Sequence, residues 1–98
     1  MTARILVVDD ILANVRLLEA KLSAEYFEVV TAMNGVDALE AVQRAKPDIV
    51  LLDVMMPGID GWETLTRLKR DSATAGIPVV IFTAREHSRG HQKSTEMG

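Results

Sequence analysis

The sequence predicts a doubly wound α/β fold, in which helices cover both faces of a parallel sheet. Four short apolar runs alternate with longer amphipathic stretches along the 98 residues. Runs that are apolar throughout, without polar alternation, are typical of strands buried on both faces, as in a parallel sheet. Strands that alternate with helices through right-handed crossovers form a doubly wound sheet. At this length we expect one domain spanning residues 1–98.

The first half of the chain is expected to form two strand–helix units. Residues 5–8 are the first buried strand, and apolar residues at helical spacing predict a helix over about 12–24. Residues 27–32 are β-branched and aromatic enough for a second strand. The turn signal Asn34-Gly35 then precedes an alanine-rich helix over about 36–45.

The second half repeats this alternation. Residues 49–52 give a third continuous apolar strand. Asp60 is well placed to cap a helix over about 61–70. Residues 79–82 are expected to be a fourth buried strand, and residues 90–97 are a weaker helical candidate because Ser, His and Gly dilute the pattern.

Polar residues that suit chemistry follow three of these strands. Asp9 and Asp10 end the first strand, Asp53 ends the third, and Thr83 ends the fourth. The carboxyl ends of parallel strands gather on one edge of a sheet, where ligands bind at the switch point in strand order. We therefore expect three carboxylates and one hydroxyl to meet in one pocket. Asp10 taken alone would also suit a helix N-cap.

This combination of residues points to phosphoryl chemistry assisted by a metal. Crowded carboxylates repel one another unless a cation lies among them. Ligands that are all oxygen favour a hard cation such as Mg²⁺. Beside that metal, one carboxylate can act as the nucleophile on a phosphoryl donor and form an aspartyl phosphate. The metal and a nearby hydroxyl would offset the charge of the phosphoryl oxygens.

Three stretches resemble the signature sequences of CheY-like response-regulator receiver domains. They are VVDD at residues 7–10, LLDVMMPGIDG at 51–61 and IPVVIFTA at 77–84. Residues 8–18 are similar to the N-terminal receiver of PleD-type regulators, whose output is a diguanylate cyclase. The resemblance runs along the whole chain and implies a flavodoxin-like sheet. It also implies a receiver, not an enzyme, that takes a phosphoryl group from a histidine kinase or phosphotransfer protein and signals by conformational change.

The resemblance assigns a role to each residue that matches the family's motifs. Asp53 is implied to be the phosphoacceptor. Asp9 and Asp10, with Asp53 and the backbone carbonyl of Met55, are implied to hold Mg²⁺. Thr83 is implied to be the switch hydroxyl that turns toward the phosphoryl group.

The end of the sequence changes the expected sheet. In the family, the stretch matching residues 96–98 is followed by a fifth strand, a lysine and a last helix, whereas this sequence ends at Gly98. The expected strand order is therefore 2-1-3-4, with the fifth strand and last helix missing. Residues 79–82 would then be an apolar edge without charge or proline, which is a template for another chain. We expect a homodimer formed through this edge.

Two other functions are compatible with the same residues. One is a non-phosphorylated interaction or dimerisation module, which the missing lysine favours. The other is an aspartyl-nucleophile phosphatase, although that enzyme would want a second carboxylate where Met55 stands. Nucleotide-binding enzymes are weaker candidates, because neither a G-x-G-x-x-G motif nor a P-loop follows the first strand.

The composition predicts a soluble cytoplasmic protein. The net charge of −3 argues against a nucleic-acid partner, for which a basic face is expected. The sequence has no cysteine, so neither a disulfide nor a thiolate–metal site is possible. It shows no secretory signal, and its apolar runs fall far short of the roughly 18 residues needed to span a membrane.

Overall fold

The computed structural model describes residues 2–54 and 61–82, which form four strands and three helices. In chain order these are β1 (Arg4–Val8), α1 (Leu12–Ala24), β2 (Glu28–Ala32), α2 (Gly35–Ala45), β3 (Ile49–Asp53), α3 (Gly61–Arg70) and β4 (Val79–Phe82). The expected bounds agree to within one residue at every end. The helix expected over residues 90–97 and the cap expected at Asp60 lie outside the described residues.

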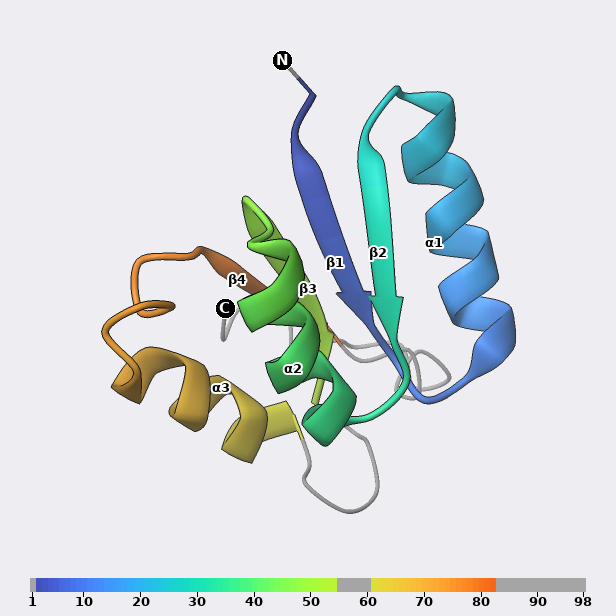
Figure 1. Ribbon diagram of the computed structural model, residues 1–98. Coiled ribbons are helices and arrows are strands. Elements are labelled where there is room, and N and C mark those ends of the chain that lie inside the picture. The colour runs from blue at the N-terminus through green and yellow to red at the C-terminus, as the bar shows by residue number, and fades with distance from the viewer. Residues whose placement is uncertain (1, 55–60, 83–98) are drawn as a thin grey trace.

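The four strands form one parallel sheet in the order β2-β1-β3-β4 (Figure 1). This confirms the predicted α/β fold and the predicted strand order 2-1-3-4. β1 lies at the centre, with Val8 paired to Ala32 of β2 and to Leu52 of β3. The order of strands reverses between β1 and β3, so the switch point lies at their carboxyl ends.

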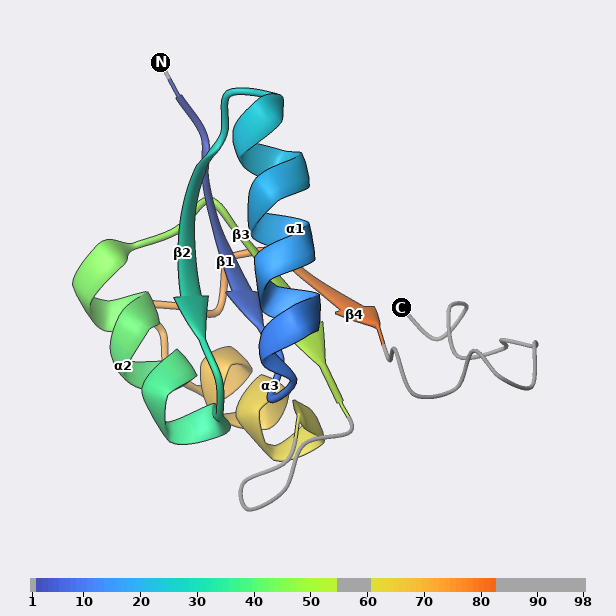
Figure 2. The same ribbon diagram turned by 90° about the vertical axis from the view of Figure 1, so that its right-hand side faces the viewer.

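Helices cover both faces of the sheet unequally. Figure 2 shows α2 and α3 on one face and α1 on the other. The main core lies on the face of α2 and α3. The strand residues that belong to it alternate along each strand, because alternate side chains point to the same side of the sheet. Its buried members are Leu6, Val8, Ala32, Ala38, Ala41, Val42, Val50, Leu52 and Leu68. On the opposite face, Val15 of α1 is buried, as are Ile5 and Val7 of β1.

The prediction that β4 is a buried strand is wrong. Val80 is 47% exposed, and Val79, Ile81 and Phe82 are only partly buried. β4 lies at the edge of the described sheet, and Val79 packs against the main core while its neighbour Val80 points to the other face. Among the described elements, α1 covers β1 and β2 on that face and does not extend over β4. A continuous apolar run therefore overstated the burial of this strand.

The two N-terminal helices begin differently. α2 has a side-chain cap, because the Asn34 amide oxygen accepts a hydrogen bond from the backbone N–H of Asp37 at 2.8 Å. α1 begins after Ile11, which has no side chain capable of capping. Asp10 is therefore not the N-cap of α1.

Of the helices that the structure describes, none is long and apolar enough to cross a membrane.

α1 ends in a Schellman motif. The backbone N–H of Tyr26 donates to the carbonyl of Ser23 at 2.9 Å, and the N–H of Phe27 donates to the carbonyl of Leu22 at 3.1 Å. Tyr26 occupies the position after the C-cap with φ of 70°, in the left-handed region where glycine is usual. Its side chain is 87% exposed, so few contacts compensate for this backbone conformation.

Replacing Tyr26 with glycine should stabilise the fold. The left-handed conformation costs an L-residue roughly 1–2 kcal/mol, part of which is offset by the greater entropy of glycine in the unfolded chain. We expect Tyr26→Gly to raise the free energy of unfolding by about 0.5–1 kcal/mol, measured by urea denaturation. Glu25→Gly is the matched control, because Glu25 has φ of −96°, a conformation that glycine does not favour over other residues. Equal destabilisation of both variants would contradict the prediction.

Candidate functional site

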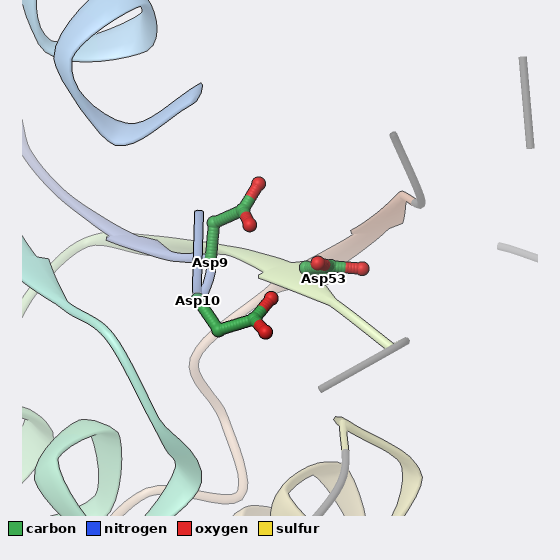
Figure 3. Close-up of side chains that lie close together, drawn as sticks. All are labelled: Asp9, Asp10 and Asp53. Carbon is green, nitrogen blue, oxygen red and sulfur yellow. The ribbon is translucent and has the colours of Figure 1, made fainter. Parts of the chain in front are cut away.

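Three carboxylates gather where β1 and β3 end. One oxygen from each of Asp9, Asp10 and Asp53 lies within 4.8 Å of the others (Figure 3). Asp53 is the last residue of β3, and Asp9 and Asp10 directly follow β1. Because Val8 pairs with Leu52, the next residue of each strand lies beside the other at the same edge. The strand register therefore assembles this cluster, which we call the aspartate cluster.

The three residues of the aspartate cluster differ in burial. Asp9 and Asp53 have no exposed surface, whereas Asp10 is partly exposed. Burying carboxylates close together is unfavourable unless hydrogen-bond donors or a cation offset their charge. The partial exposure of Asp10 gives an ion access to the cluster from solvent.

Asp9 is held by hydrogen bonds from three directions. Its backbone N–H donates to the carbonyl of Ala32 in β2 at 3.2 Å. Its Oδ1 accepts from the backbone N–H of Ile11 at 3.0 Å, and its Oδ2 accepts from Nδ2 of Asn14 at 3.1 Å. Both carboxylate oxygens are thus fixed from the side of α1. Asn14 was not among the residues expected at the site, although its place in the first turn of the helix after Asp9-Asp10 was a usable signal.

Asp53 lies against the first residue of α3. A Cβ built on Gly61 would lie 2.4 Å from the carbonyl oxygen of Asp53 and 2.3 Å from Cα of Val54. Only a residue without a side chain permits this approach, so glycine is required at this position by close packing. Trp62, the next residue, is 46% exposed. Gly61 belongs to one of the signature stretches of the sequence, but no role at the site was expected for it.

The structure brings together three of the five residues expected at the site. Met55 and Thr83 lie outside the described residues, so their expected roles as carbonyl ligand and switch hydroxyl stay predictions. The three aspartates form a donor set made only of oxygens within reach of one ion. Such a set suits a hard divalent cation, which prefers carboxylate and carbonyl oxygens and water. The donor set thus fits a metal of the type expected.

Comparison with known proteins gives concordant matches in sequence and structure. Residues 5–98 match the family described as the response regulator receiver domain. The chain is 58% identical over 98 residues to the response regulator PleD of Caulobacter vibrioides. The aligned region covers 100% of this chain but only 22% of PleD. A response regulator receiver protein from Methanoculleus marisnigri has an N-terminal domain with 42% identity and a TM-score of 0.79, covering 88% of this chain and 74% of that one.

A further similar structure is that of the response regulator TrrA from Thermotoga maritima in complex with Mg(2+)-BeF. Its identity to this chain is 35% and its TM-score is 0.79, over 95% of this chain and 79% of that one.

Gly61→Ala should strongly destabilise the fold. The new methyl group would overlap backbone atoms of Asp53 and Val54, which cannot rotate away as a flexible side chain can. We expect the free energy of unfolding to fall by about 3 kcal/mol, at the upper end of what overpacking usually costs. Urea denaturation measures this loss.

Gly76→Ala is the control for this substitution. A Cβ at Gly76 would have no atom within 4 Å, so we expect its stability to stay within about 0.5 kcal/mol of the wild type. Equal effects of the two substitutions would show that α3 adjusts and that the close contact of Gly61 is not required.

Proposed function

The chain belongs to the response regulator receiver domain family, and we propose that it accepts a phosphoryl group on Asp53 in two-component signalling. The observation that carries this proposal is the meeting of Asp9, Asp10 and Asp53 at the carboxyl edge of the sheet. The chain spans about a fifth of the length of PleD, so we propose a function for the receiver alone.

The proposed reaction is a phosphoryl transfer to a carboxylate. An oxygen of Asp53 attacks phosphorus, an O–P bond forms, and the bond between phosphorus and the donor breaks. We propose that the donor is a phosphohistidine on a histidine kinase or a phosphotransfer protein. Burial of Asp53 supports this role, because a water-poor site strengthens the electrostatic interactions that stabilise developing charge.

We propose that Asp9, Asp10 and Asp53 hold Mg²⁺, with the carbonyl of Met55 as a further ligand. When bound, Mg²⁺ would offset the negative charge of the carboxylates and of the incoming phosphoryl group. The oxygen-only donor set supports this choice of metal. So does the relative from Thermotoga maritima, which is described as a complex containing Mg²⁺. Thr83 is proposed to turn its hydroxyl toward the phosphoryl group.

The contact of Gly61 offers a route by which a change at Asp53 would reach α3. The carbonyl of Asp53 and the backbone of Val54 lie directly against the start of this helix. Close-packed backbone cannot shift on one side of such a contact without displacing the other. We propose that phosphorylation alters the position of α3 in this way and that the change is read by a partner. A cytoplasmic location suits such a partner and stays a prediction.

Asp53→Asn should abolish phosphoryl uptake while leaving the fold intact. The substitution keeps the size of the side chain and removes the nucleophilic carboxylate. The test is intact-mass measurement after incubation with Mg²⁺ and a small phosphodonor such as acetyl phosphate. Asp48→Asn is the matched control. Asp48 directly precedes β3, at the end of the strand opposite to Asp53, so its substitution should leave phosphoryl uptake unchanged.

The outcomes of this experiment separate the candidate functions. Phosphate on the Asp53→Asn variant would place the acceptor elsewhere. A wild-type chain that gains no phosphate would favour the alternative, a receiver fold that acts as a non-phosphorylated interaction module.

We propose that the 98-residue chain forms a homodimer through β4. No described strand pairs with the outer edge of β4, and the apolar side chain of Val80 in this strand is exposed on one face of the sheet. Light scattering after size exclusion should show a dimer at high concentration. Val80→Lys should weaken it, because a charge on an edge strand discourages pairing. Val36→Lys, a change at an exposed valine of α2, should not. A monomer at all concentrations would contradict the prediction.

A further inference from the structure

We propose that Asn14 is a positioning residue of the metal site, which holds the Asp9 carboxylate in the orientation that Mg²⁺ requires. The inference rests on the proposed function, since it assumes that the aspartate cluster binds this ion. The carrying observation is the 3.1 Å hydrogen bond from Nδ2 of Asn14 in α1 to Oδ2 of Asp9. Asn14 is itself partly buried, so its amide is shielded from full exchange with water.

The bond from Asn14 completes the immobilisation of Asp9. The main chain of Asp9 is fixed by β2 through the carbonyl of Ala32, and Oδ1 is fixed by the N–H of Ile11. A single bond to Oδ1 leaves the carboxylate free to rotate about it. A second bond to Oδ2 fixes the plane of the carboxylate. Loss of Asn14 would therefore loosen the orientation of a ligand without removing the ligand.

Asn14 orients Asp9 without neutralising it. An amide is an uncharged donor, whereas a lysine or arginine at this position would supply a cation and reduce the need for a metal. The negative charge of the aspartate cluster thus remains to attract a divalent ion. Outer-shell hydrogen bonds of this kind hold metal ligands in place, and their loss typically weakens metal affinity by about 10–100-fold.

The same pair of side chains occurs at the start of α2, where it serves a different purpose. Nδ2 of Asn34 donates to Oδ2 of Asp37 at 3.1 Å, and its amide oxygen caps the helix. Both residues are exposed and neither belongs to the aspartate cluster. Asn34 is therefore a matched control, because it has an equal amide–carboxylate bond that contributes only to the fold.

The identity of the ion gives a readout that separates orientation from stability. Mg²⁺ demands nearly ideal octahedral geometry, whereas Ca²⁺ accepts a flexible arrangement of oxygens. A loosened Asp9 should therefore weaken the binding of Mg²⁺ more than that of Ca²⁺. A general loss of folding would instead weaken the binding of both ions by the same factor.

The experiment is calorimetric titration of the phosphate-free chain with MgCl₂ and with CaCl₂. Asn14→Leu, similar in size, and Asn14→Ala both favour a helix, and circular dichroism confirms that each is folded. We expect both variants to raise the Kd for Mg²⁺ about tenfold or more and the Kd for Ca²⁺ by a smaller factor. Asn34→Ala should lower the melting temperature and leave both Kd values unchanged.

The outcomes distinguish this inference from the function on which it rests. If the wild type binds Mg²⁺ and the Asn14 variants bind it equally well, the inference is overturned and the proposed function stands. Equal weakening for Mg²⁺ and Ca²⁺ also overturns it, since orientation is then not what Asn14 supplies. If the wild type binds no Mg²⁺, both the proposed metal site and this inference are overturned.

Discussion

The in-register pairing of β1 with β3 is the constraint on which the site depends. It sets Val8 opposite Leu52, so the residues that follow, Asp9 and Asp53, leave the sheet side by side. A shift of one residue along either strand would turn its side chains to the opposite face. That shift would turn apolar residues of the main core away from α2 and α3 toward the face covered by α1, and it would separate the two carboxylates. Burial of Leu6, Val50 and their neighbours thus fixes the geometry of the polar edge.

The helices on the two faces of the sheet contribute differently to the fold and to the site. The main core is formed by α2 and α3 against one face, and it holds the strands in register. The hydrogen bonds to the Asp9 carboxylate come from the other side, from Ile11 and from α1. A helix with few buried residues can thus orient a ligand while contributing little to the core.

The fold was predictable because its signals are local. Continuous apolar strands, turn residues and helical spacing are each read within a short window, and they gave the elements and their order. The three aspartates were also predictable, since strand ends in a parallel sheet converge. The bond from Asn14 and the close contact of Gly61 were not. Both depend on which element lies opposite in space, and neither an asparagine in a helix nor a glycine in a motif contains that information.

The aromatic side chains at the two ends of the sheet make the chain its own optical probe. The sequence has a single tryptophan and a single tyrosine. Trp62 directly follows Gly61, which packs against the backbone of Asp53, and Tyr26 lies before β2 near the amino ends of the strands. Emission from the indole would register events near the aspartates, while the phenol signal from the distant loop would serve as an internal reference. No dye or inserted label is then needed to follow ion binding in real time.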